Sequence, residues 1–197
     1  MNQRGFSLAE LLAVLALLGS LLAIAAPPLL RISGDLRVRL AAEELVGVLR
    51  LARAYAVRNS ARVAVKFRTE KTGAVTFTLY RDGDGDGVLT RDIDKGVDPQ
   101  VGPPRRLSNL GRGVGFGFPP GPPPTDPGSP GKPLTGLDDP IRFNQSDLAS
   151  FDPLGTSTPG TLYFTDHQSR LAAVRVFNRT GKVRVLFYDP ETRVWRD

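Results

Sequence analysis

The 197-residue chain contains no cysteine and a single histidine, His167. Without cysteine it has no disulfide framework, no thiolate metal site and no cysteine nucleophile. One histidine argues against a histidine-based zinc site and against histidine-driven acid–base catalysis. Lysine and arginine total 26 against 20 acidic residues, for a formal net charge of +6. This balance is compatible with binding to nucleic acid or anionic lipid, but it does not choose between them.

The amino terminus combines a glycine, an aromatic residue and a carboxylate with a long apolar run. The sequence RGFSLAE occupies residues 4–10, and apolar residues then continue almost without interruption to Ala26. At about 1.5 Å per residue a helix over 6–26 is about 32 Å long, which matches the hydrocarbon core of a bilayer. A secretory signal peptide and a plain membrane anchor are the alternatives. Both leave Glu10 unexplained, because a carboxylate in an apolar span is costly unless it has a partner.

This terminus resembles the class III signal of type IV pilins and pseudopilins. The resemblance implies that a prepilin peptidase removes residues 1–5 by cutting after Gly5, and methylates the new terminal amine of Phe6. It assigns the assembly carboxylate to Glu10 and the helix-kinking proline to Pro27. In that family the apolar helix first anchors the subunit in the inner membrane and later packs inside an extracytoplasmic filament. An ion pair between Glu10 and the amine of a neighbouring subunit would then fix the register of assembly.

Residues 31–60 are expected to continue as an amphipathic helix. Their apolar residues recur at the spacing of one helix face: Leu45, Val48, Leu49, Ala52, Tyr55 and Ala56. The sequence therefore predicts a long helix with two halves. The first half, 6–30, is a transmembrane and filament-core segment, and the second half, 31–60, packs on the head.

Residues 61–197 are expected to form a β-rich head. Period-two alternation of apolar residues predicts strands over 61–68, 74–81, 161–165, 171–178 and 183–188. Proline and glycine crowd the interval of about 99–160, which we expect to be an extended surface loop with short strands at most near 114–118 and 141–143. The expected fold is α+β and pilin-like, with the helix packed on an antiparallel sheet.

Two motifs in the head resemble the FimT/GspH family of minor pilins and pseudopilins. They are FDPLG at 151–155 and TGKVRV at 180–185, and the whole resemblance covers about 4–98 and 140–190. It implies a structural subunit, not an enzyme, of a type IV pilus or a type II secretion pseudopilus, acting in initiation or at the tip. The implied partners are other pilin subunits, the prepilin peptidase and, before assembly, the inner membrane.

The sequence DGDGDG at 82–87 has the spacing of a calcium-binding loop. Alternate carboxylates at Asp82, Asp84 and Asp86 can turn toward one centre, and Gly87 permits the sharp turn that follows. Asp92 or Asp94 would have to complete the ligand set, because the position of the usual bidentate glutamate holds Ile93. The alternative is a solvated acidic turn. Calcium is thus the one cofactor that the sequence suggests.

The carboxy-terminal hairpin is basic. In the FimT branch of the family a Gly-Arg-x-Arg motif at this place is associated with DNA uptake. This chain has Gly181, Lys182 and Arg184 at the matching positions, with Arg179 nearby. Lysine in place of the first arginine weakens bidentate phosphate recognition. The alternative function is therefore a DNA-binding minor pilin of a competence pilus, and ordinary solvated strand charges are the simpler interpretation.

Overall fold

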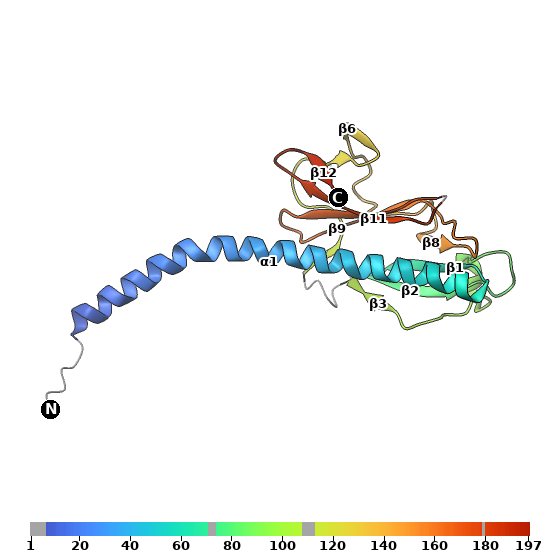
Figure 1. The fold of residues 1–197 in the computed structure, drawn as a ribbon, viewed down its shortest axis with the longest axis horizontal. Coiled ribbons are helices and arrows are strands. Elements are labelled where there is room, and N and C mark those ends of the chain that lie inside the picture. The colour runs from blue at the N-terminus through green and yellow to red at the C-terminus, as the bar shows by residue number, and fades with distance from the viewer. Residues whose placement is uncertain (1–6, 71–73, 108–112, 179) are drawn as a thin grey trace, which may run out of the picture. The chain divides into compact units, whose positions relative to one another are not determined.

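In the computed structural model the backbone is described for residues 7–70, 74–107, 113–178 and 180–197, and the side chains for the same residues except 24–33. The chain divides into two compact units, Met1–Leu36 and Arg37–Asp197. The helix α1, Leu8–Asn59, contributes to both units (Figure 1). In the part of the chain that is described, no helix is long and apolar enough to cross a membrane.

The Arg37–Asp197 unit, called the head below, adds a short helix, α2 (Thr90–Lys95), and a series of antiparallel strands. The strands are β1 (Val63–Thr69), β2 (Val75–Arg81), β3 (Arg105–Arg106), β4 (Gly115–Phe116), β5 (Thr125–Asp126), β6 (Ser129–Pro133), β7 (Ile141–Arg142), β8 (Leu148–Phe151), β9 (Gly160–Thr165), β10 (Leu171–Val176), β11 (Val183–Asp189) and β12 (Val194–Arg196).

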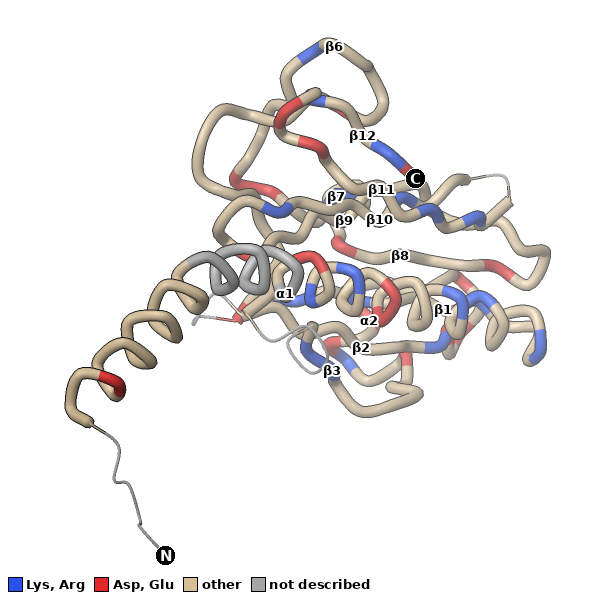
Figure 2. Tube along the Cα trace, turned by 60° about the vertical axis from the view of Figure 1, so that its left-hand side comes forward, with Lys and Arg blue, Asp and Glu red and all other residues tan. Residues whose placement is uncertain are grey.

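The strands form two main sheets and one small hairpin. The first sheet has the order β3-β2-β1-β8, and the second has the order β12-β11-β10-β9-β4 with β7 also paired to β9. Strands β5 and β6 pair only with each other. Within the head, α1 runs with β9–β11 on one side and β2–β3 on the other (Figures 1 and 2). The α+β architecture expected from the sequence is confirmed, with two sheets in place of one.

The inner face of α1 is built largely from small residues. Its buried positions are at most 3% exposed: Val38, Ala41, Ala42, Leu45, Val46, Leu49, Ala52 and Ala56. These positions share one core with residues of both sheets, including Val63 and Val65 of β1 and Leu162 and Phe164 of β9. Alanine keeps that face of the helix narrow, so strands from two sheets pack directly against it. The predicted helical face is therefore confirmed, with Val48 and Tyr55 partly buried at its margin.

Phe67 of β1 lies at the centre of an aromatic cluster. Its ring centroid is 6.0 Å from that of Phe77, 5.8 Å from that of Phe116 and 6.1 Å from that of Phe143, the last pair being stacked. Phe116 and Phe143 belong to the stretch of about 99–160 that the sequence predicts to be an extended surface loop. The short strands expected near 114–118 and 141–143 are confirmed as β4 and β7. The expected surface position is wrong for these two phenylalanines, because they pack in or against the main core.

Strand β8 is a second correction to the same segment. It pairs with β1 along the edge of the first sheet, with Val65 opposite Ala149. Two hydrogen bonds connect another part of the segment to β12 and the residue before it. The Trp195 indole nitrogen donates to the Thr125 carbonyl at 2.7 Å, and the Thr125 hydroxyl donates to the Arg193 carbonyl at 2.9 Å. The proline-rich chain is therefore attached at several points to the sheets.

We expect Gly160→Ala to destabilise the head by about 1–3 kcal/mol, the usual cost of overpacking. A Cβ atom at this position would lie 2.2 Å from the Phe143 ring and 2.5 Å from the Arg142 carbonyl oxygen. Gly47→Ala is the control, because a Cβ there meets no atom within 4 Å. On an exposed helical position it should stabilise by up to about 1 kcal/mol. Urea unfolding of the head measures both, and equal midpoints for the two variants would contradict the packing described.

Candidate functional sites

The first turn of α1 holds Glu10 in a capping box with Ser7. The Ser7 backbone N–H donates to the Glu10 carboxylate at 2.9 Å, and the Glu10 N–H donates to the Ser7 hydroxyl at 3.3 Å. This reciprocal pair satisfies two backbone donors, and it places the carboxylate at the positive end of the helix dipole. The sequence analysis identified Glu10 but not Ser7, although Ser-x-x-Glu before an apolar run is a recognised signal.

The other residues predicted for processing and assembly are described only in part. Gly5 and Phe6 lie outside the described residues. Pro27 lies within α1, but its side chain is also outside the described part.

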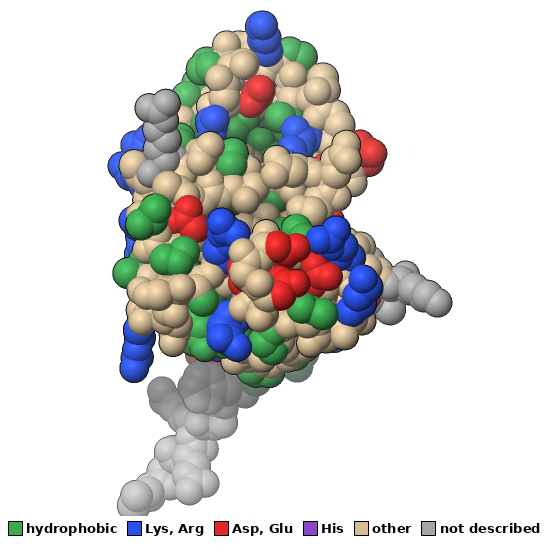
Figure 3. Space-filling view, turned by 90° about the vertical axis from the view of Figure 1, so that its right-hand side faces the viewer, with side chains coloured by type: hydrophobic (Ala, Val, Ile, Leu, Met, Phe, Trp, Pro, Cys, Tyr) green, Lys and Arg blue, Asp and Glu red, His purple; other side chains and the backbone are tan. Residues whose placement is uncertain are grey.

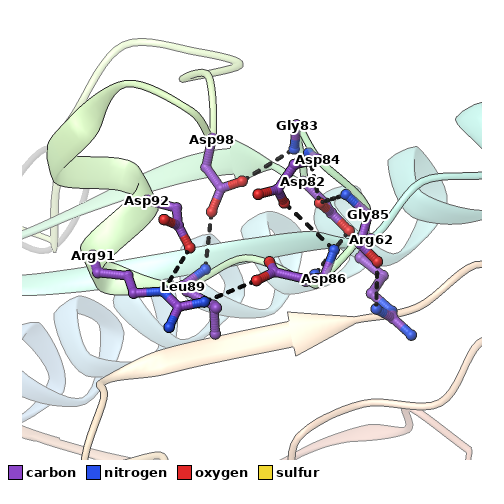
Figure 4. Close-up of polar contacts among 11 residues, drawn as sticks. Arg62, Asp82, Gly83, Asp84, Gly85, Asp86, Leu89, Arg91, Asp92 and Asp98 are labelled. Atoms are coloured by element: carbon purple, nitrogen blue, oxygen red, sulfur yellow. Dashed lines mark hydrogen bonds and ion pairs between the residues drawn. The ribbon is translucent and has the colours of Figure 1, made fainter.

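The loop after β2 gathers three aspartates at one end of the head. One carboxylate oxygen from each of Asp82, Asp84 and Asp86 lies within 4.8 Å of the others (Figure 4). The Asp82 carboxylate also closes the loop, accepting backbone N–H groups from Gly85 at 2.7 Å and from Gly87 at 3.0 Å. The three predicted residues are thus brought together by the turn of the backbone.

Asp98 supports this loop from the far side of α2. It is only 1% exposed, and its carboxylate accepts the N–H groups of Gly83 at 3.0 Å and Leu89 at 2.9 Å. Gly83 permits the close approach of the two segments, since a Cβ atom there would lie 1.9 Å from the Val97 carbonyl oxygen. Asp98 is a part of this candidate site that the sequence analysis did not identify.

The charges around the loop are partly compensated. Arg91 donates to Asp86 at 2.9 Å and to Asp92 at 3.1 Å, so Asp92 lies against an arginine and outside the group of three (Figure 4). Desolvation, followed by the hydrogen bond and charge of neighbouring Asp84, raises the pKa of Asp86, while Arg91 opposes the shift. Figure 3 shows the acidic side chains as one patch with basic side chains beside it. Calcium at this patch stays a prediction.

The basic hairpin exposes two of its three predicted residues. Lys182 directly precedes β11 and Arg184 lies within it, and both side chains are exposed. Arg184 forms an ion pair with Asp197. Arg179 lies outside the described residues. Lys182 is therefore the more accessible of the two described cations.

We expect calcium in tenfold excess over its Kd to stabilise the head by about 1.4 kcal/mol, because it binds the folded loop and not the unfolded chain. A Kd of about 10⁻⁴–10⁻³ M is typical of extracellular calcium modules. Asp84→Asn should remove most of this response, and magnesium at equal ionic strength should not reproduce it. Thermal melting of the head measures the effect.

Asp94→Asn is the matched control for the calcium experiment. Asp94 pairs with Arg68 at 2.7 Å, away from the group of three, so its removal should leave the calcium response intact. A melting temperature that does not change up to millimolar calcium would identify the loop as a solvated turn.

Two protein families match the chain. The family described as Type II transport protein GspH matches residues 41–181, and the one described as Prokaryotic N-terminal methylation motif matches residues 1–26. No curated protein and no solved structure matches the chain significantly. The first match covers most of the head, and the second covers the terminus that carries Ser7 and Glu10. The chain therefore belongs to the GspH family, whose members are minor pilin and pseudopilin subunits, and it carries their N-terminal methylation motif.

Proposed function

We propose that the chain is a minor subunit of an extracytoplasmic filament, a type II secretion pseudopilus or a type IV pilus, and that it acts in initiation or at the tip. The proposal depends mainly on the amino terminus, where the methylation motif coincides with a carboxylate held at the start of an apolar helix. Pilin-like families are structural, and we infer the same role here. The prepilin peptidase would cut after Gly5 and methylate Phe6.

The apolar first part of α1 supports a role in assembly. Its large side chains are each more than half exposed: Leu8, Leu11, Leu12, Val14, Leu15, Leu17, Leu18, Leu21 and Leu22. A helix that is apolar on all sides requires cover from lipid or from other helices. We infer that the inner membrane provides this cover before assembly, through a single pass over about 6–30, and that other subunits provide it afterwards.

The capping box suggests how Glu10 is kept in this apolar setting. Cleavage after Gly5 creates an amine on Phe6, the residue that directly precedes Ser7. The Glu10 carboxylate already accepts the Ser7 N–H, so its charge is held close to the place where that amine appears. A mature neighbour can then offer its own amine to the same carboxylate, as a charge-assisted pair in a medium of low dielectric.

We expect Gly5→Val to remain a precursor in the membrane, because the peptidase requires a small residue before the cut. Glu10→Ala should mature normally but enter filaments at least about tenfold less well than the natural chain, since removal of one charge-assisted pair costs about 1.5–3 kcal/mol. Mass spectrometry of the amino terminus measures processing, and a competition between tagged chains measures incorporation.

Two substitutions elsewhere in the same helix are the controls. Gly19→Val adds bulk where a Cβ meets no atom within 4 Å, and Ser20→Ala removes a hydroxyl that donates to the Ala16 and Leu17 carbonyls of the same helix. Both should be processed like the natural chain. Undiminished incorporation of Glu10→Ala would overturn the assembly role of this carboxylate.

DNA binding by the head is the alternative function, and the exposed pair Lys182 and Arg184 favours it. Two phosphate contacts would give weak binding whose affinity falls about tenfold between 50 and 200 mM salt. Fluorescence anisotropy with duplex DNA measures this, and Lys182→Ala should weaken binding more than Lys132→Ala on the β5–β6 hairpin. Equal binding curves for the two variants would leave the structural role as the only proposed function.

A further inference from the structure

Two turns of the head, those of the FDPLG and TGKVRV motifs, lie against each other. A Cβ atom at Gly181 would lie 2.7 Å from the Gly155 carbonyl oxygen, so the two turns are in close contact. Both glycines have positive φ angles, 85° at Gly155 and 55° at Gly181, which other residues rarely adopt. The Ser157 N–H, just after the first turn, donates to the Asn178 carbonyl just before the second, at 3.0 Å. The two motifs therefore form one continuous surface.

Arg53 of α1 lies against both turns. Its Nη2 is 3.3 Å from the place that a Cβ atom of Gly155 would occupy, and its Nε is 3.0 Å from the corresponding place at Gly181. A side chain at Gly181 would crowd the guanidinium, so the two glycines keep a seat open for it. Arg53 is nevertheless exposed, and it forms no hydrogen bond or ion pair with the described part of the chain.

The carboxylate of Asp152, in the first of these turns, is occupied by its own turn. It accepts the Leu154 N–H at 2.8 Å and the Thr156 N–H at 3.1 Å, together with the Thr156 hydroxyl. The Thr156 hydroxyl, with these backbone donors, lowers the pKa of Asp152. Asp152 is therefore satisfied locally, and the guanidinium of Arg53 is held in position with its donors available to a ligand.

Two further cations lie near Arg53 in the fold. Lys182 directly follows Gly181, and Arg50 precedes Arg53 by three residues, about one turn of α1. Both side chains are exposed, and neither forms an ion pair with a described residue. Since these cations belong to two separate elements, they suit a ligand whose phosphates repeat along a chain, because each cation can contact a different phosphate.

We propose that Arg53 is a phosphate-contacting residue of a DNA-binding surface that α1 and the turn at Gly181 form together. A guanidinium binds phosphate through two parallel hydrogen bonds, whereas the ammonium of Lys182 acts as a point charge. Arg53 thus supplies the bidentate contact that the hairpin lysine does not. The inference rests on the alternative function proposed above, and it adds to that function a contact from the helix.

Fluorescence anisotropy of the full chain in detergent micelles, with labelled duplex DNA, tests this assignment. Arg53→Gln should weaken binding about tenfold at 50 mM salt, and it should reduce the slope of log affinity against log salt by about 0.9, the share of one phosphate contact. Arg53→Lys should keep that slope, because it keeps the charge. Arg105→Gln is the control and should change neither value by as much, since this exposed arginine of β3 also forms no ion pair in the described chain and lies across α1 from β11 (Figure 1).

The melting temperature of each variant separates a phosphate contact from a structural role. Equal losses of affinity and slope in Arg53→Gln and Arg53→Lys, with a lowered melting temperature, would mean that Arg53 only holds the two turns, and would overturn the inference. A slope for Arg53→Gln equal to that of the natural chain, or equal to that of Arg105→Gln, overturns it as well, while a loss in Lys182→Ala would still support DNA binding by the head. No binding by the natural chain would reject both the alternative function and this inference.

Discussion

The head depends on the contact between the narrow inner face of α1 and two sheets at once. Ala41, Ala52 and Ala56 allow strands to approach the helix from both sides, and Leu45 and Leu49 fill the space between them. A larger residue at an alanine position would separate one sheet from the helix, and with it the aromatic cluster around Phe67. The acidic loop directly follows strand β2 of the first sheet, so its position depends on this packing.

The sequence predicts the long elements well and only some of the short ones. The face of α1 and strands β1, β2, β9, β10 and β11 are found because each repeats its period over at least six residues. Strands β4 and β7 lie where short strands are expected, near 114–118 and 141–143. Strand β3 has only two residues, so it carries no period and forms only through its pairing with β2. Phe116 and Phe143 enter or border the core from a segment whose proline and glycine content predicts a surface position.

The candidate sites also differ in predictability, because some are built from neighbouring residues of the sequence and others from distant ones. Glu10 and the group of three aspartates follow from motifs of consecutive residues, and the structure places each as a local turn would. Asp98 supports the acidic loop from beyond α2, and no short motif joins it to Asp82. The apolar hollow lined by Leu51, Phe77 and Pro103 likewise combines α1 with β2 and the chain before β3. Such sites become visible only once the fold brings distant segments together.

The surfaces that the chain leaves uncovered are informative about its energetics. A fully buried leucine contributes about 1.5–3 kcal/mol, so the exposed leucines and valine of the first half of α1 together represent on the order of 10 kcal/mol or more. This is comparable with the whole stability of a typical domain, which is about 5–15 kcal/mol. Under the proposed function, a subunit cannot leave the membrane for water and then join a filament. It must pass from lipid directly onto neighbouring helices.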